Sequence, residues 1–539
     1  MVPFLAQTMV PSPARTMVPS PAQTMVPSPA RTMVPSPAQT MVPSPARVRL
    51  KGVSNANNRS FFLLRAGFSV RIGRGSYITW LPLPIGRLCI MSFESAVEDY
   101  RHGRLAAARR KLAAIDEVRA KLLFVRIYTR LRHTTGVDSA IAISREIWKS
   151  AKEELNDRVE AGILLSFLLV RIGSVSEGER CIEETKQIIG DIAITSGLEA
   201  ELWLGLSIIL FAQHRYLESE RMSWNAIYAD LELGSKAKDE SYTIVSIQTT
   251  KARAFHVLSL IRGTQERYHE QYRLLREAMT ILRTARLPDV FLMGVLQANR
   301  SFYARDLGIL SEIVELEISP LNVWSDDMAG FRLEVERSLG YLYALNGDED
   351  AAIRKFQDAS YFADSDENRL LLISDEAYIS RQAASPHLLN QEMLDACQTA
   401  DRIDWSSMDV QRYSLHAFAQ ELSLIDATRA NQYLDRYLAL ESKTSPLAVT
   451  DKRADAEAQY SIGIVALASG QRDRGLDALA NAYETWAAIG FRWRAAAAAI
   501  ELADQPGHAA LANYAARESL QYPHSWLARR VGRLSYQES

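Results

Sequence analysis

The residues that could carry chemistry are scattered along this chain rather than grouped in spacings that catalysis or metal binding requires. No GxxxxGK[ST], HExxH, GxSxG or CxxC pattern occurs. The segment RIGRGSYITW contains Gly73 and Gly75 but no third glycine, so it matches a dinucleotide-binding motif only weakly. The nine histidines are isolated, and His214 is expected in an exposed hairpin turn. The sequence therefore predicts a protein that is not an enzyme and has no cofactor or metal site.

Acidic and aromatic residues favour structural roles. Pairs of acidic residues stand where helices are expected to begin, and a carboxylate there caps free backbone N–H groups and complements the helix dipole. These pairs are Asp326 with Asp327, Asp348 with Asp350, and Asp364 with Asp366. Large aromatic residues at helical spacing are expected in the core between helix hairpins, and they include Trp203, Trp224, Tyr343, Phe356 and Trp486.

Composition indicates a globular protein with an unusual distribution of charge. The 539 residues are 47% hydrophobic and 23% charged. Residues 1–90 hold ten bases and no acid, which leaves 52 bases and 64 acids in the remainder. An acidic remainder argues against a general duplex-binding protein. Three scattered cysteines favour a reducing compartment. Because no apolar run reaches the roughly 18 residues of a membrane span and no signal peptide is visible, we expect a cytoplasmic protein.

An eight-residue unit, TMVPSPA followed by Arg or Gln, repeats from Thr8 to Arg47. Its identity at neutral positions indicates recent duplication of nucleotide sequence, and its prolines block helix and sheet. We expect residues 1–47 to be a disordered low-complexity segment and the acid-free residues 48–90 to lie outside the folded protein. The leading interpretation is a natural start at Met91 after translated upstream sequence. An organelle transit peptide and a proline-rich docking arm are the alternatives.

After these residues, one pattern repeats along the chain: two helix-forming segments joined by a glycine or polar turn. Its clearest unit spans 339–360, where the repeat-defining residues are Leu339, Gly340, Tyr343, Gly347, Ala352, Phe356 and Ala359. These offsets resemble a tetratricopeptide (TPR) repeat. Gly340 allows two helices to approach closely, and Gly347 ends the first of them. The unit departs from the family at Glu336, where Trp is preferred, and at Asp364, where Pro is preferred.

Weaker units extend this pattern over the rest of the chain. Residues 96–115 supply Tyr100, Gly103 and Ala108, residues 462–482 supply Gly463 and Gly470, and residues 210–227 keep the turn. Further hairpins are expected around 117–153, 156–190, 237–285, 366–400 and 406–442. At roughly 34–40 residues per hairpin, about 11–13 hairpins are expected after residue 90. The sequence therefore predicts an all-α fold, a right-handed superhelical solenoid of antiparallel helix pairs over 91–520, with 521–539 as a tail or capping helix.

One stretch near the C-terminus carries a second resemblance. The sequence ALANAYETWAAIGFRWRAAAAAIELA (478–503) resembles the last repeats of helical arrays in bacterial LuxR-type transcription regulators, where an IGxRWxAAxAxxEL stretch recurs. That family usually adds a helix-turn-helix module and an ATPase domain, but this chain has neither an LTxRExEVL-like entry nor a phosphate loop. The resemblance implies a transcription regulator of this type, or the sensor remnant of one. Arg492, Trp493 and Arg494 are the candidate partner-binding residues, and a packed Trp between two solvated arginines is the alternative.

Taken as a whole, these features favour a non-catalytic TPR-like scaffold that binds a protein or peptide partner in its concave groove. The first helices of successive hairpins are expected to line that groove, and a few aromatic or arginine anchors are expected to carry the affinity. The alternative is a LuxR-type transcription regulator, or its effector-binding remnant without the helix-turn-helix. Membrane insertion is not expected, for the reason given above. Direct nucleic-acid binding is not expected either, because the basic patches at 109–121 and 526–534 are typical of solvated helices. The partner and the oligomeric state stay open.

Overall fold

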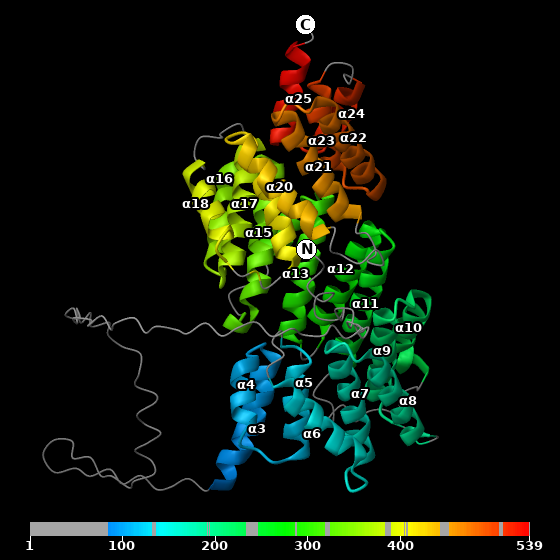
Figure 1. The fold of residues 1–539 in the computed structure, drawn as a ribbon. Helices are drawn as coiled ribbons and strands as arrows, with labels where there is room; N and C mark the ends of the chain where they lie inside the picture. The colour runs from blue at the N-terminus through cyan, green and yellow to red at the C-terminus, as the bar shows by residue number, and fades with distance from the viewer. Residues whose placement is uncertain are drawn as a thin grey trace, which may run out of the picture. The chain divides into compact units, whose positions relative to one another are not determined.

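The computed structural model describes most of the chain from residue 85 onward. The described residues are 85–131, 136–190, 192, 194–232, 246–285, 288–318, 324–382, 390–403, 405, 408–441, 452–505 and 510–537. Within these residues every regular element is a helix, and successive helices lie side by side (Figure 1). None of the described helices is long and apolar enough to cross a membrane.

The helices follow one another in pairs. In chain order they are α3 (Ile85–Arg101), α4 (Leu105–Leu112), α5 (Val118–Tyr128), α6 (Val137–Lys149), α7 (Leu155–Arg171), α8 (Val175–Ile189), α9 (Ser196–Ala212), α10 (Tyr216–Glu232), α11 (Ile247–Thr264), α12 (Tyr268–Thr284), α13 (Val290–Leu307), α14 (Glu312–Glu317), the 3₁₀ turn η3 (Asp326–Met328), α15 (Ala329–Asn346), α16 (Glu349–Ser360), α17 (Asp366–Gln382), α18 (Asn390–Ala400), α19 (Met408–Leu422), α20 (Ala427–Glu441), α21 (Lys452–Ala468), α22 (Arg472–Ile489), α23 (Arg492–Ala503), α24 (Ala510–Ser519) and α25 (Trp526–Gln537). The described residues thus form eleven pairs, from α3/α4 to α23/α24, followed by α25.

The pair α15/α16 illustrates how the local sequence makes a hairpin. Gly347 ends α15 with φ +86°, a left-handed conformation that glycine adopts without strain. The carboxylate of Asp348 then caps α16 by accepting a hydrogen bond from the backbone N–H of Ala351 at 2.9 Å. A Cβ on Gly340 would lie 2.7 Å from the ring of Phe356, so the missing side chain allows the two helices to approach.

The first helix of a pair is more deeply buried than the second. Helix α9 contacts α7, α10 and α11, and its residues Leu204 to Phe211 are all buried. Helix α10, the second of its pair, exposes Leu217 and Glu218 at its start. A helix flanked on several sides must be apolar nearly all round, whereas an outer helix needs one apolar stripe. This difference explains why residues 202–212 of α9, LWLGLSIILFA, carry no charge.

Helices far apart in the sequence also meet. Near α4, the backbone N–H of Ala106 donates to Asp327 at 3.0 Å, and the hydroxyl of Ser325 donates to the carbonyl of Gly103 at 2.8 Å. These bonds join the first pair to the segment that leads into the seventh pair. The first pair therefore contacts the segment just before the seventh pair, as expected when a stack of helix pairs winds into a superhelix.

A second long-range contact joins α12 and α13 to α23. The indole N–H of Trp493 donates to the backbone carbonyl of Arg305 at 2.9 Å. The rings of Tyr268 and Phe491 lie with centroids 5.0 Å apart. Residues of α12, α13, α15, α21, α22 and α23 consequently share one apolar cluster.

The predicted all-α array of antiparallel helix pairs is confirmed. The hairpins expected around 117–153, 156–190, 366–400 and 406–442 correspond to α5/α6, α7/α8, α17/α18 and α19/α20. Helix α3 begins at Ile85 and therefore includes Met91, the predicted natural start. The predicted low-complexity segment 1–47 lies outside the described residues, as does most of 48–90. In the predicted tail, α25 packs against α23 and α24.

Candidate functional site

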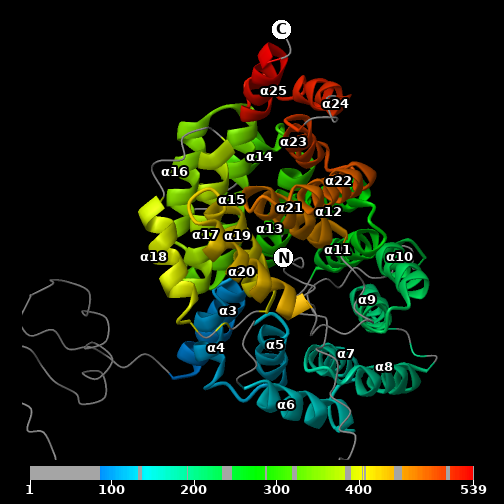
Figure 2. The same ribbon diagram turned by 45° about the horizontal axis from the view of Figure 1, so that its top comes forward.

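The first helices of the sixth to eleventh pairs, α13, α15, α17, α19, α21 and α23, meet in the middle of the second half of the array (Figure 2). We call them the inner helices. Helix α15 contacts α13 and α17, helix α19 contacts α17 and α21, and helix α23 contacts α13. The charged residues that they carry at mid-helix positions therefore face one another rather than solvent.

Buried ion pairs link α13, α15 and α17. Arg305 of α13 lies 3.2 Å from Glu334 of α15. Arg337, on the same face of α15, donates two hydrogen bonds to Asp375 of α17 and lies 3.2 Å from Glu334. The hydroxyl of Tyr341 also donates to Asp375, at 2.7 Å. Each of these five side chains is buried, so their charges compensate one another in a site of low dielectric.

Polar contacts continue through α19 to α21. Tyr413 of α19 donates to Asp375 at 3.1 Å. One turn later, Nδ1 of His416 lies 3.1 Å from the hydroxyl of Ser461 on α21. Burial lowers the pKa of His416 to about 4, so its imidazole is neutral at neutral pH.

Four charged residues close the circle between α13, α21 and α23. Asp306 of α13 lies 2.9 Å from Arg494 of α23 and 3.7 Å from Arg453 of α21. Glu457 of α21 lies 3.3 Å from Arg494 and 3.6 Å from Arg453. The polar contacts thus run from α13 through every inner helix and back to α13. We call this set of contacts the inner circle.

The arginines hold both acids of this closure in the charged form. Burial alone would raise the pKa of Asp306, but the Arg494 and Arg305 guanidiniums outweigh it and hold that pKa well below its usual range. Burial would likewise raise the pKa of Glu457, and Arg453 and Arg494 lower it instead. For Arg494, the two carboxylates outweigh burial and raise its pKa above its ordinary value. The closure is therefore an ionic one at all ordinary pH values.

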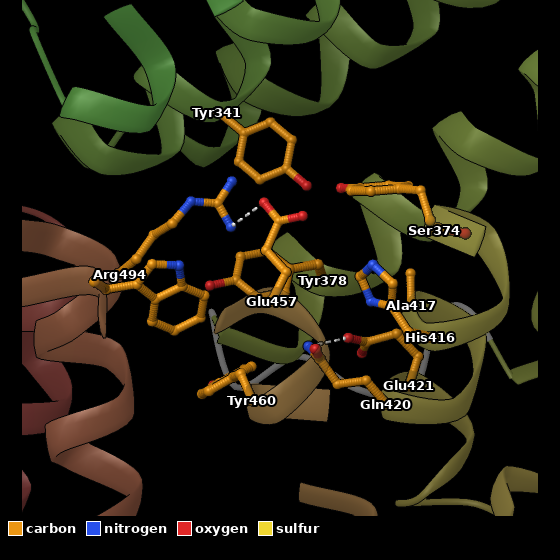
Figure 3. Close-up of a pocket in the computed structure, with 12 residues that line it drawn as sticks. Tyr341, Ser374, Tyr378, His416, Ala417, Gln420, Glu421, Glu457, Tyr460 and Arg494 are labelled. Carbon is orange, nitrogen blue, oxygen red and sulfur yellow. Dashed lines mark hydrogen bonds and ion pairs between the residues drawn. The ribbon is translucent and has the colours of Figure 1, made fainter. Parts of the chain in front are cut away.

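A pocket opens inside the inner circle (Figure 3). Its wall comes from five inner helices and α22, and the lining residues are Tyr341, Ser374, Tyr378, Tyr413, His416, Ala417, Gln420, Glu421, Glu457, Tyr460, Trp486 and Arg494. They surround about 430 Å³ of empty space, part of which is open to solvent.

The wall of the pocket combines five aromatic residues with six polar or charged ones and Ala417. Figure 3 shows the carboxylate of Glu457 directed toward Arg494 and Tyr341. On the opposite side, the amide of Gln420 donates to Glu421 at 2.9 Å. Such a mixture of aromatic and polar groups can fix both the position and the orientation of a bound group.

The structure separates the three residues that the sequence offered as partner-binding candidates. Arg494 lines the pocket and takes part in the inner circle. Trp493 is only 1% exposed, and its indole N–H is bonded to the backbone of α13. Arg492 is exposed at the start of α23. The sequence motif therefore places one of the three at the pocket, one in the core and one at the surface.

The residues predicted to define the repeats lie within hairpins or at their turns, and none of them lines the pocket. Leu339, Gly340, Ala352, Phe356, Ala359, Tyr100, Ala108 and Gly463 are buried. Gly103, Gly347 and Gly470 have positive φ at helix ends. Tyr343 is half-buried, and its hydroxyl donates to Glu317 at 2.9 Å. In the predicted exposed turn, His214 is exposed with φ 61°.

Sequence reasoning missed most of the pocket residues. Tyr341, Tyr378, His416 and Glu457 each lie on a different stretch of the chain, in a helix that resembles ordinary core. A usable signal was the recurrence of charged residues in the middle of otherwise apolar first helices, as in RLEVERSLGYLY of α15. Across the described residues, no group of three or more His, Cys, Asp or Glu side chains is arranged to hold a metal ion.

Comparison with known proteins gives partial structural likenesses. No known family profile and no curated protein matches the sequence. The apo form of the quorum sensor NprR from B. thuringiensis is 11% identical, with a TM-score of 0.43, and the match covers 69% of this chain and 98% of that one. The apo form of RapI is 14% identical, with a TM-score of 0.38, covering 78% and 96%. A Rap protein complexed with Competence and Sporulation Factor is 13% identical, with a TM-score of 0.34, covering 78% and 98%. Because every TM-score is below 0.5, none of these likenesses decides the function.

Proposed function

We propose that this chain is a non-catalytic TPR-like scaffold that binds an extended peptide segment of a partner along its inner helices. The observation that carries the proposal is the pocket inside the inner circle, where side chains from six helices converge on one space. A stack of helix pairs presents its first helices on the inner side, and such surfaces commonly take peptides or helices. The pocket then receives one group of that peptide, and the surrounding inner helices contact its neighbours. The proposed location is the cytoplasm.

The experiment is a selection of random peptides by the immobilised full-length chain, followed by titration of the selected peptides. A pocket-filling variant tests where they bind. Ala417 lines the pocket, so Ala417→Trp places an indole in the space. Ala488, exposed on the outer helix α22, offers the matched control Ala488→Trp.

We expect Ala417→Trp to weaken the selected peptides by at least about tenfold, equivalent to about 1.4 kcal/mol, and Ala488→Trp to leave their affinity unchanged. Circular dichroism and thermal unfolding establish that both variants are folded. Two results contradict the proposal: no peptide is enriched on the full-length chain, or Ala417→Trp binds the enriched peptides as tightly as the parent chain does.

The second candidate function is that of a LuxR-type transcription regulator or its effector-binding remnant. Its support is the resemblance of residues 478–503, which form the end of α22, the turn at Gly490 and α23. Retention of partners from a lysate with and without nuclease separates the two candidates. Partners that stay after nuclease treatment favour the scaffold, whereas recovery only through DNA or with polymerase subunits favours the regulator.

A further inference from the structure

The first helices of the second to fifth pairs, α5, α7, α9 and α11, are neighbours in the first half of the array (Figure 2). Ion pairs connect them to one another and to the start of α13. Arg126 of α5 donates two hydrogen bonds to Glu201 of α9, at 2.7 Å and 2.9 Å, and lies 2.6 Å from Glu160 of α7. Arg130, in the turn after α5, donates to both carboxylate oxygens of Asp289. Each of these three carboxylates is therefore held by Arg126 or Arg130.

Arg253 of α11 is a third guanidinium among these residues, and it has no carboxylate of its own. In the part of the chain that the structure describes, no carboxylate oxygen lies within 4.0 Å of its nitrogens, and it donates no hydrogen bond. Its guanidinium carbon lies 4.9 Å from the ring centre of Phe167, so the side chain reaches from α11 to α7. Arg253 is half-buried, and its five N–H groups are therefore within reach of a ligand.

The surroundings compensate the charge of Arg253 poorly. Burial lowers its pKa, the carboxylate of Glu201 opposes this shift, and the guanidiniums of Arg130 and Arg126 add to it. Glu201 cannot cancel the shift, because both of its oxygens are bonded to Arg126. The paired arginines behave in the opposite way, since their carboxylates raise the pKa of both Arg126 and Arg130. A cation removed from water without a carboxylate costs free energy, and a ligand that supplies one would recover it.

A second guanidinium without a carboxylate lies on the same face of α7. Arg171 follows Phe167 by four residues, so the two side chains stand one helical turn apart. Arg171 donates to the backbone carbonyl of Tyr128 at 2.7 Å, and no carboxylate among the described residues lies within 4.0 Å of it. Phe167 therefore has one unpaired guanidinium over its ring and another on the next turn of its helix.

We propose that Arg253, lying over Phe167 and assisted by Arg171, binds a carboxylate group on the first helices of the first half of the array. A planar guanidinium holds both oxygens of a carboxylate through two parallel hydrogen bonds, and an aromatic ring behind it fixes its orientation. The proposal rests on the proposed peptide binding for the source of the carboxylate, which is either an Asp or Glu side chain or the C-terminus of the peptide. Binding of the carboxylate itself can be measured without a peptide partner.

The experiment titrates the full-length chain with three small probes by calorimetry at constant ionic strength. Nα-acetyl-glutamate N-methylamide presents a side-chain carboxylate, and Nα-acetyl-alanine presents a C-terminal carboxylate. Nα-acetyl-glutamine N-methylamide is the neutral counterpart of the first probe. We expect at least one carboxylate probe to bind about tenfold or more tightly than the glutamine probe. Which of the two carboxylates binds better identifies the source of the group.

Variants assign the binding to Arg253. Arg253→Gln removes the guanidinium and is expected to weaken the carboxylate probe about tenfold or more. Arg221, exposed on the outer helix α10, offers the matched control Arg221→Gln, which should leave the affinity unchanged. Because Arg253 has no ion pair to lose, Arg253→Gln is expected to keep the melting temperature of the parent chain. If it melts lower or fails to fold, Arg253→Lys decides the matter, because it keeps the charge without the planar fork and should weaken the probe about threefold or more.

The proposal is overturned if neither carboxylate binds up to about 50 mM, if the glutamine probe binds equally well, or if the Arg253 variants bind the carboxylates as tightly as the parent chain does. The peptide selection distinguishes this failure from failure of the proposed function. Enriched peptides that lose affinity in Ala417→Trp, together with silent carboxylate probes, refute the carboxylate site and leave peptide binding intact. Carboxylate probes that bind through Arg253 while no peptide is enriched support the site and contradict the scaffold.

Discussion

Asp306 is the residue whose neutralisation is expected to weaken the inner circle most. Its side chain is completely buried and lies 2.9 Å from Arg494, 3.2 Å from Arg305 and 3.7 Å from Arg453. The substitution Asp306→Asn keeps the volume but removes the charge, which leaves three buried guanidiniums without their shared partner. Breaking a buried ion pair by removing one partner costs about 3–5 kcal/mol. We therefore expect the free energy of unfolding to fall by at least about 3 kcal/mol.

The assay is urea unfolding followed by circular dichroism and tryptophan fluorescence, with an exposed ion pair as control. Asp401 lies 2.5 Å from Arg436, and its side chain is 44% exposed. Asp401→Asn is therefore expected to cost less than about 1 kcal/mol. The pKa of Asp306 lies below its ordinary value, so its contribution is present above about pH 4 and is lost only in more acid solution. The difference between the two variants should persist from pH 5 to pH 8, and equal losses at pH 7 would refute the reasoning.

Two further predictions concern a buried histidine and a glycine turn. The Nε2 atom of His256 lies 3.0 Å from Asn299, and burial lowers the pKa of this histidine to about 3. In the unfolded chain the same side chain titrates near 6.5. The free energy of unfolding therefore falls as the pH drops from about 6.5 toward about 3. Measured by urea unfolding, His256 is expected to reduce the free energy of unfolding of the parent chain by about 2 kcal/mol between pH 7.5 and pH 5, and the His256→Gln variant should lack this contribution. Identical losses in the two chains would contradict this prediction. Gly347→Ala is expected to cost more than about 2 kcal/mol, because φ is +86° and the new Cβ would lie 2.3 Å from the carbonyl oxygen of His524. Gly470→Ala, with φ +75° but nothing within 4 Å, is expected to cost only about 1 kcal/mol, and equal melting temperatures would show that the contact with His524 does not matter.

The helix pairs could be predicted from the sequence because their determinants are local. Gly347 ends a helix by its own conformation, Asp348 caps the next helix three residues from its bond partner, and Phe356 meets Gly340 within one hairpin. All of these signals lie within about twenty residues. The contacts between helix pairs far apart in the chain have no such local signal, because they depend on small rotations that add up over many interfaces between neighbouring pairs.

The inner circle shows where sequence reasoning ends. The motif around Trp493 correctly indicates a packed indole, but Arg494 beside it is buried as well, paired with Asp306, 188 residues away. Helical periodicity gives the buried face of a helix and does not give the element that covers it. The same limit applies to Trp486. It is buried, as predicted for a core residue, with only 2% of its surface exposed, but it also lines the pocket, which helical periodicity does not indicate.

The inner circle and the pocket share Arg494 and Glu457, and this overlap links closure of the array to ligand binding. Arg494 divides its guanidinium between Asp306 at 2.9 Å and Glu457 at 3.3 Å. A ligand group that contacts Glu457 or Arg494 in the pocket changes how Arg494 is shared between the two carboxylates. The reverse also holds, because coupling between two sites is reciprocal. Loss of the charge at Asp306 leaves Arg494 paired with Glu457 alone, so it should change the affinity of any ligand that contacts either of these two residues in the pocket.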